Sequence, residues 1–188
     1  SLNILAGRLL EGMDAVLEQE EPDWVLVQGD TTTAFCAGLA AFHRQIRVGH
    51  VEAGLRTGDL ASPFPEEANR CQLARIATLH FAPTRLATEA LRAEGIEATL
   101  VLVTGNTVVD AIHQAQTSWP AGIPVSVPSA IKVRLEAGDT VLVTCHRREN
   151  FGSVMEAFCH MLARLCLRYP ELQWIFPVHL NPAVQEPV

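Results

Sequence analysis

The alternation of short apolar runs with helical segments is the feature that most limits how this chain can fold. Apolar residues recur at helical spacing at Leu2, Leu5, Leu9 and Met13, and Pro22 ends this helix before an apolar run at 24–27. Helical segments at about 34–43, from 66, and at 85–94 then alternate with expected strands at 47–51, 79–81 and 100–103. Strands that alternate with helices predict βαβ units, so we expect an α/β fold with a parallel sheet.

A proline-rich stretch divides the chain. Residues 117–128 contain Pro120, Pro124 and Pro128 and predict a linker between a first domain at 1–116 and a second at 129–188. The second segment predicts a strand at 140–144, a helix at 154–168 and a strand at 173–177. Two strands are few for a doubly wound sheet, and the chain opens directly into a helix. We therefore expect the middle part of a longer protein.

Charge and composition exclude several classes of protein. The net charge is -7 with no basic block, which argues against a nucleic-acid-binding protein. Apolar stretches are interrupted well before 18 residues, and no signal-peptide pattern opens the chain, so we expect a cytoplasmic protein without membrane spans. The five cysteines form no C-x-x-C pair and are expected to be reduced.

Carboxylates follow three of the expected strands. Asp30 comes just after the first strand, Glu52 just after the second, and Glu66 and Glu67 follow Pro65 at a helix start. Ligands of open α/β sheets bind outside the carboxyl ends of the strands, so these acids are candidates for catalysis. Asp30 could instead cap the next helix, but the threonines that follow it can also do so.

The neighbours of these acids leave several roles open. Strand alternation predicts that His50 and Glu52 point to the same face. Either Glu66 or Glu67 can interact with the helix dipole. Arg56 and Arg70 are ion-pair partners of the acids or contacts for a diphosphate, and the sequence does not choose between them.

A basic cluster precedes the helix at 154–168. His146 and Arg147 follow a strand end, where backbone N–H groups, the helix dipole and guanidinium groups favour a diphosphate; a solvated basic turn is the alternative. His179 follows the next strand. Asp30, His50 and Glu52 could form a set of zinc ligands, but no metal-binding motif supports this, and no dinucleotide or P-loop motif is present. We expect neither a metal nor a cofactor.

Six motifs occur in a fixed order along most of the chain. They are GDTTT from Gly29, HVEAGLRTG from His50, SPFPEEANR from Ser62, GNTVVD from Gly105, TCHRRENFG from Thr144 and PVHLNP from Pro177. Together they resemble the non-hydrolysing UDP-N-acetylglucosamine 2-epimerases. The departures are Gln28, where many members have His, and Cys145, where Gly is usual.

The resemblance implies two Rossmann-like domains of the glycosyltransferase-B type, both incomplete in this chain. It also implies an isomerase that binds a UDP-sugar, eliminates UDP to form 2-acetamidoglucal and adds UDP back, and a homodimer of the full-length protein. Glu67 is expected to be a capping or solvent-facing residue. The implied catalytic residues are Asp30, Glu52, Glu66 and His146, and the implied substrate-binding residues are Arg56, Arg70, Asn106, Arg147 and His179.

The individual acid/base roles stay open, and three alternatives remain. These are a hydrolysing 2-epimerase, a glycosyltransferase of the same fold, and a nucleotide-sugar-binding domain without catalysis. We expect the 188-residue chain alone to lack epimerase activity, because catalytic groups need a complete, rigid cleft.

Overall fold

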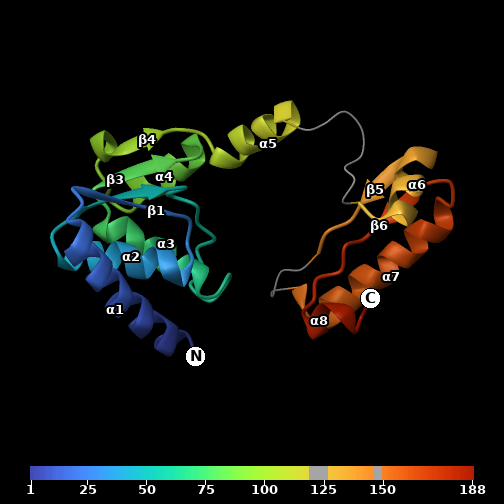
Figure 1. Ribbon diagram of the computed structural model, residues 1–188, viewed down its shortest axis with the longest axis horizontal. Coiled ribbons are helices and arrows are strands. Elements are labelled where there is room, and N and C mark those ends of the chain that lie inside the picture. The colour runs from blue at the N-terminus through green and yellow to red at the C-terminus, as the bar shows by residue number, and fades with distance from the viewer. Residues whose placement is uncertain (119–126, 146–149) are drawn as a thin grey trace. The chain divides into compact units, whose positions relative to one another are not determined.

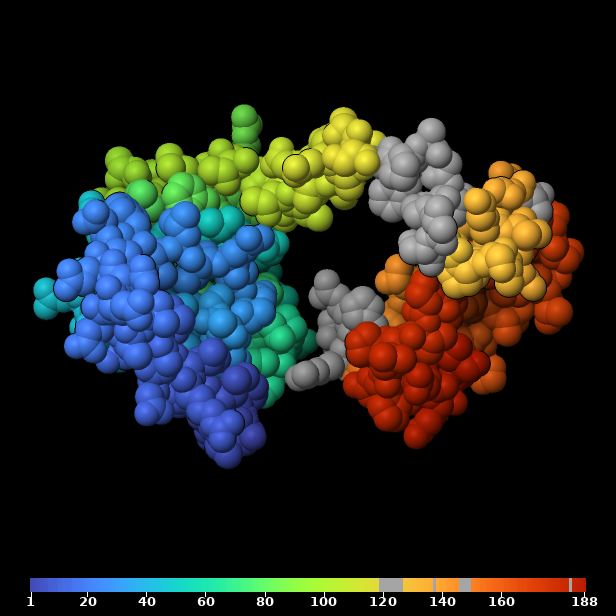
Figure 2. Space-filling view, viewed as in Figure 1, coloured from blue at the N-terminus to red at the C-terminus, as the bar shows by residue number. Residues whose placement is uncertain are grey.

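The structure is a computed structural model that describes residues 1–118, 127–145 and 150–188 (Figure 1). The chain divides into two compact units, Ser1–Thr117 and Ser118–Val188. Figure 2 shows both units in space-filling form, with the residues outside the described ranges in grey. Each unit is described by itself below.

The first unit contains a four-stranded, fully parallel sheet in the order β1-β2-β3-β4. The strands are β1 (Trp24–Gln28), β2 (Arg47–Val51), β3 (Leu79–Ala82) and β4 (Val101–Val103). The helices are α1 (Leu2–Glu20), α2 (Thr32–His43), α3 (Glu66–Ile76), α4 (Arg85–Ala93) and α5 (Thr107–Ser118), with a 3₁₀ turn, η1, at Ala98–Leu100. The predicted α/β fold with a parallel sheet is confirmed.

The helices of this unit bury one face of the sheet. Val27 and Val48 pack with α2 and with Leu73 of α3, and Ala82 and Val101 pack with residues of α4. Figure 1 shows α1, α2 and α3 on the same side of the strands. This arrangement follows from the strand order, because successive crossovers of one hand that run in one direction place their helices on one face. The carboxyl ends of the four parallel strands therefore share one edge.

Helices α2 and α4 are each capped by a threonine. The Thr31 hydroxyl accepts a hydrogen bond from the Ala34 N–H at 3.1 Å, and Thr84 does the same for Ala87 at 3.1 Å. Because Thr31 caps α2, Asp30 is not the cap and its carboxylate is available for other contacts.

The second unit is built around two parallel strands, β5 (Thr140–Leu142) and β6 (Gln173–Ile175). Its helices are α6 (Ser129–Ala137), α7 (Ser153–Arg168) and α8 (Pro182–Gln185). The assigned strands are shorter than the sequence predicts, although Val143 still donates to the Ile175 carbonyl at 2.8 Å. Met155 of α7 and Val184 of α8 are fully buried.

The predicted linker lies mostly outside the described residues, since α5 extends to Ser118 and the next described residue is 127. Across the described residues, none of the helices combines the length and the apolar character that crossing a membrane requires.

Candidate active site

A glycine turn places Asp30 at the carboxyl end of β1. Gly29 has a φ of 73°, and its N–H donates to the carbonyl of Val51, the last residue of β2, at 3.0 Å. The Gly29 carbonyl is 2.8 Å from Nε2 of the buried His50. Both the N–H and the carbonyl of Gly29 therefore bond to β2, and this holds the turn that carries Asp30 against the neighbouring strand.

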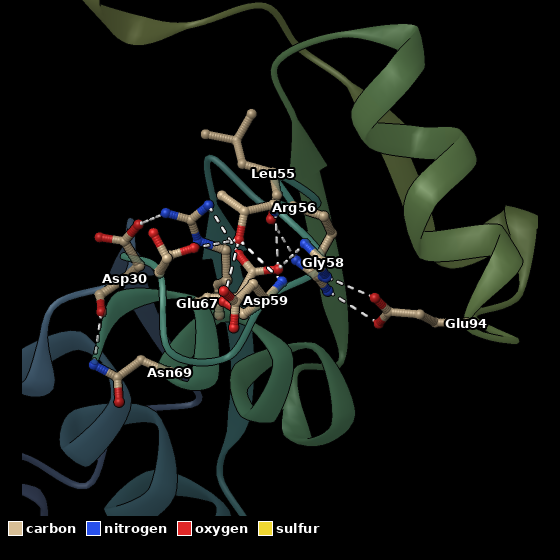
Figure 3. A network of polar contacts seen from close by, with 11 residues as sticks. Asp30, Leu55, Arg56, Gly58, Asp59, Glu67, Asn69 and Glu94 are labelled. Carbon is tan, nitrogen blue, oxygen red and sulfur yellow. Dashed lines mark hydrogen bonds and ion pairs between the residues drawn. The ribbon is translucent and has the colours of Figure 1, made fainter. Parts of the chain in front are cut away.

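Helix α3 holds Asp30 through two further contacts. Arg70 Nη2 forms an ion pair with Asp30 Oδ2, and Asn69 Nδ2 donates to the Asp30 carbonyl at 2.8 Å (Figure 3). Asn69 is almost fully buried, and the Arg70 side chain is 12% exposed. The structure thus brings together Asp30 and Arg70, two of the predicted site residues, and shows Arg70 as an ion-pair partner.

Glu67 is buried inside this network, with a relative exposure of 1%. Its Oε1 accepts hydrogen bonds from the backbone N–H groups of Thr57 at 2.9 Å and Gly58 at 3.0 Å. Its Oε2 lies 3.2 Å from Arg70 Nη1. The expectation that Glu67 is a capping or solvent-facing residue is wrong, because its carboxylate holds a loop and a guanidinium in the interior.

Glu66 differs from its neighbour. It is the first residue of α3 and is half-buried, and within the part of the chain that the structure describes its carboxylate has neither a hydrogen bond nor an ion pair. Adjacent residues of a helix point about 100° apart, so burial of Glu67 directs Glu66 away from the interior. Of the two adjacent acids, Glu66 is the one available to a ligand.

Glu52 lies beside the same turn but outside the regular strand. Strand β2 ends at Val51, and Glu52 takes a φ of 65°. The predicted strand alternation therefore stops one residue before Glu52. A Cβ added at Gly29 would lie 3.7 Å from Glu52 Oε2, so this carboxylate is next to the turn that carries Asp30.

Asn106 holds Glu52. Its Nδ2 donates to Glu52 Oε1 at 3.2 Å, and its Oδ1 accepts from the N–H of Val108 in the first turn of α5 at 3.0 Å. Both ends of the Asn106 amide are thus engaged within the chain. The role implied for Asn106, binding of substrate, stays a prediction.

Arg56 forms a forked ion pair with Glu94 at the end of α4 (Figure 3). The distances are 2.6 Å from Nε to Oε1 and 3.0 Å from Nη2 to Oε2, and Nη1 donates to the Leu55 carbonyl at 2.8 Å. The hydrogen bond from Arg56 lowers the pKa of Glu94. The ion-pair alternative for Arg56 is thus present in the structure, and its contact with a diphosphate stays a prediction.

Two histidines are buried side by side in adjacent strands of the sheet. His50 and His80 are register partners in β2 and β3, and both are fully buried. Burial lowers the pKa of both, that of His80 to about 4. His80 was not singled out in the sequence, where a lone histidine in an apolar strand gives no sign of its neighbour across the sheet.

Metal ligation finds no support in the part of the chain that is described. No group of three or more His, Cys, Asp or Glu side chains there is arranged to hold a metal ion. His50, one of the residues considered for zinc, directs Nε2 to the Gly29 carbonyl instead.

The predicted residues of the second unit are only partly described. His146 and Arg147 lie outside the described residues. His179 is exposed after β6, and its Nδ1 accepts from the Asn181 N–H at 3.1 Å. All five cysteines are free thiols, and Cys145 Sγ is 3.9 Å from Asn150 Nδ2.

Known proteins resemble this chain along its whole length. A UDP-N-acetylglucosamine 2-epimerase from Yersinia pestis is 47% identical in a match that covers 96% of this chain and 49% of that protein. The UDP-N-acetylglucosamine 2-epimerase of Escherichia coli K12 is 45% identical in a match that covers 96% of this chain and 49% of that protein. The chain therefore spans about half the length of these relatives.

Solved structures agree with the sequence comparison. The UDP-GlcNAc 2-epimerase of Neisseria meningitidis bound to UDP-GlcNAc matches with a TM-score of 0.88 and 40% identity, over 100% of this chain and 51% of that one. The S. aureus MnaA–UDP structure matches with a TM-score of 0.89 and 41% identity, over 100% and 49%. This similarity confirms the predicted fold of the glycosyltransferase-B type. Because the family model for UDP-N-acetylglucosamine 2-epimerases matches residues 1–188, the chain belongs to the UDP-N-acetylglucosamine 2-epimerase family.

Proposed function

We propose that the protein containing this chain interconverts UDP-N-acetylglucosamine and UDP-N-acetylmannosamine without net hydrolysis. Support comes from family membership over all 188 residues and from the relative that binds UDP-GlcNAc. The observation that carries the proposal is that Glu52 lies beside the Gly29 turn that carries Asp30, at the carboxyl ends of adjacent strands. Glu66, which is unengaged among the described residues, starts the helix that holds Asp30.

The reaction requires acid/base groups on both faces of the sugar. In the elimination step a carboxylate takes the C2 proton, the C1–O bond to UDP breaks, and UDP leaves with the electron pair as 2-acetamidoglucal forms. UDP then adds back at C1 while a proton is delivered to the other face of C2. General acids and bases of this kind contribute roughly 10²- to 10⁴-fold in rate.

The three candidate acids are in different environments. Asp30 is paired with Arg70, Glu52 is bonded to Asn106, and Glu66 has no partner among the described residues. In this proposal the first unit thus supplies two carboxylates held by partners, Asp30 and Glu52, and one carboxylate without a partner among the described residues, Glu66. The assignment of base and acid among them stays open.

The diphosphate needs positive charge, and the two arginines of the candidate site in the first unit are already paired. Arg70 is shared by Asp30 and Glu67, and Arg56 is paired with Glu94. We therefore assign stabilisation of the leaving UDP to His146 and Arg147, as their place before a helix start suggests, with His179 as a further contact.

A product assay tests the proposal. The protein, expressed from its complete reading frame, is incubated with UDP-N-acetylglucosamine, and the products are separated. UDP-N-acetylmannosamine at equilibrium with substrate supports it. Free sugar would indicate a hydrolysing epimerase, transfer only with an acceptor would indicate a glycosyltransferase, and binding without turnover would indicate a silent domain. The same preparation, measured by light scattering, tests the homodimer.

A further inference from the structure

The most unusual buried group that the proposed reaction does not use is the carboxylate of Glu67. A carboxylate with 1% exposure is costly unless hydrogen bonds and a counter-charge compensate for the lost water. Glu67 has both, from the N–H groups of Thr57 and Gly58 and from Arg70. These partners come from two segments, the loop after β2 and helix α3 itself.

The two oxygens of Glu67 hold different structures. Oε1 holds the backbone of the 57–58 loop, and Oε2 faces Arg70 Nη1. The other terminal nitrogen of the same guanidinium, Nη2, reaches Asp30. The contact at Nη1 is an ion pair without hydrogen-bond geometry, so Arg70 is held there by the charge of a buried carboxylate while Nη2 is presented to a candidate catalytic carboxylate.

Arg70 alone would not fix Asp30 well. Its Nε has no hydrogen-bond partner among the described residues, so the two terminal nitrogens carry the contacts that define its position. Removing the contact to Glu67 leaves the guanidinium held only through Nη2, at its contact with Asp30. A misplacement of about 1 Å in a catalytic group can cost roughly 10²-fold in rate.

We propose that Glu67 is a positioning residue that sets the place of Asp30 through Arg70. This inference rests on the proposed epimerase function, in which Asp30 acts on substrate. Glu67 itself does not reach substrate, because it is buried.

Glu67→Gln tests the proposal selectively. Glutamine has the same shape, and its oxygen still accepts the two loop N–H groups, but its NH₂ group meets Arg70 Nη1 as donor against donor. We expect kcat for epimer formation to fall by about 10- to 100-fold, with KM for the UDP-sugar little changed. A large rise in KM with an unchanged kcat would overturn the proposal.

A second background separates positioning from a general loss of structure. Arg70→Met removes the guanidinium and leaves the Glu67 carboxylate buried without its counter-charge. In that background Glu67→Gln should raise the unfolding temperature and should not lower kcat further. Glu94→Gln, which breaks the ion pair with Arg56 instead, is the matched control. It should change kcat and the unfolding temperature by the same amount whether or not Arg70→Met is present. Equal loss of kcat on Glu67→Gln with and without Arg70 would contradict the proposal.

The two claims can fail separately. If the unsubstituted protein forms no epimer, the proposed function is wrong. The unfolding measurements then still test whether Glu67 acts on Asp30 through Arg70. A coupling between Glu67 and Asp30 in the free energy of unfolding, lost on Arg70→Met, can be measured without any enzymatic turnover. Additive unfolding effects of Glu67→Gln and Asp30→Asn would overturn it.

Discussion

Glu67 and Arg70 lie one turn apart on α3, with Glu67 Oε2 3.2 Å from Arg70 Nη1, and the same guanidinium reaches Asp30. This pair explains why Glu67 positions Arg70 and why only its neighbour Glu66 is available to a ligand. One is buried and bonded, and the other has no partner among the described residues.

Removing the two adjacent acids should therefore affect stability very differently. Glu67→Ala leaves Arg70 with half of its contacts and two loop N–H groups unpaired, so we expect a loss of about 3–5 kcal/mol in the free energy of unfolding. Glu66→Ala loses only a dipole interaction and should change it by about 1 kcal/mol or less. Urea unfolding of both variants measures this, and equal losses would show that the Glu67 contacts do not contribute.

Gly54 should not tolerate a side chain. It has a φ of 89°, and an added Cβ would lie 2.3 Å from the Ala87 carbonyl oxygen on α4. Gly54→Ala should cost about 3 kcal/mol or more, since backbone strain and overpacking add.

Gly58→Ala is the matched control for this substitution, because Gly58 has a φ of 80° but open space around it. It should cost only the backbone strain, about 1–2 kcal/mol. Thermal unfolding of the two variants compares them, and similar losses would mean that α4 does not pack against Gly54 as described.

Arg56 should matter more for stability than for UDP binding. Arg56→Lys keeps the charge but loses the forked contact with Glu94, so we expect a loss of about 1–2 kcal/mol in unfolding free energy. Glu94→Gln should cost a similar amount. The UDP dissociation constant, measured by calorimetry, should change little; a large rise with unchanged stability would instead identify Arg56 as a diphosphate contact.

Acid should destabilise the first unit through its buried histidines. The pKa of His80 is about 4 in the folded protein, because of burial and the nearby His50 and Arg56, against an attraction from Glu94. The unfolded chain takes up this proton near pH 6.5. The contribution of His80 to the free energy of unfolding is therefore fully present above about pH 6.5. It is lost as the pH drops toward 4, by on the order of 3 kcal/mol.

Urea midpoints between pH 7.5 and 4.5 test this dependence. His80→Leu removes one titrating group and should make the midpoint fall less steeply with decreasing pH. His43→Gln is the control, since His43 is exposed, and should leave the slope unchanged. An unchanged slope for His80→Leu would show that His80 does not contribute.

Most of the first unit could be predicted from the sequence, because its strands alternate regularly with helices that bury one face. Helix α5 was not foreseen. None of its residues is buried, and Val108 and Ile112 are 52% and 53% exposed, so no buried stripe marks it. The second unit's strands are shorter than their apolar runs suggest.

The sequence places the candidate acids after neighbouring strands but does not predict the contacts that they make. On a helix, Arg70 is three residues from Glu67 and four from Glu66, and both spacings allow an ion pair. Only the fold decides, by turning Glu67 toward the 57–58 loop. Likewise, the partner of Arg56 is Glu94, 38 residues away, which no local pattern indicates.

Reaction in D₂O tests the central claim most directly. If carboxylates such as Asp30, Glu52 and Glu66 carry the C2 proton, it passes through groups that exchange with solvent. Protein expressed from its complete reading frame should convert UDP-N-acetylglucosamine into UDP-N-acetylmannosamine that carries deuterium at C2, as read by mass spectrometry and NMR. UDP-N-acetylmannosamine that retains full protium at C2, or no such product at all, would contradict the account.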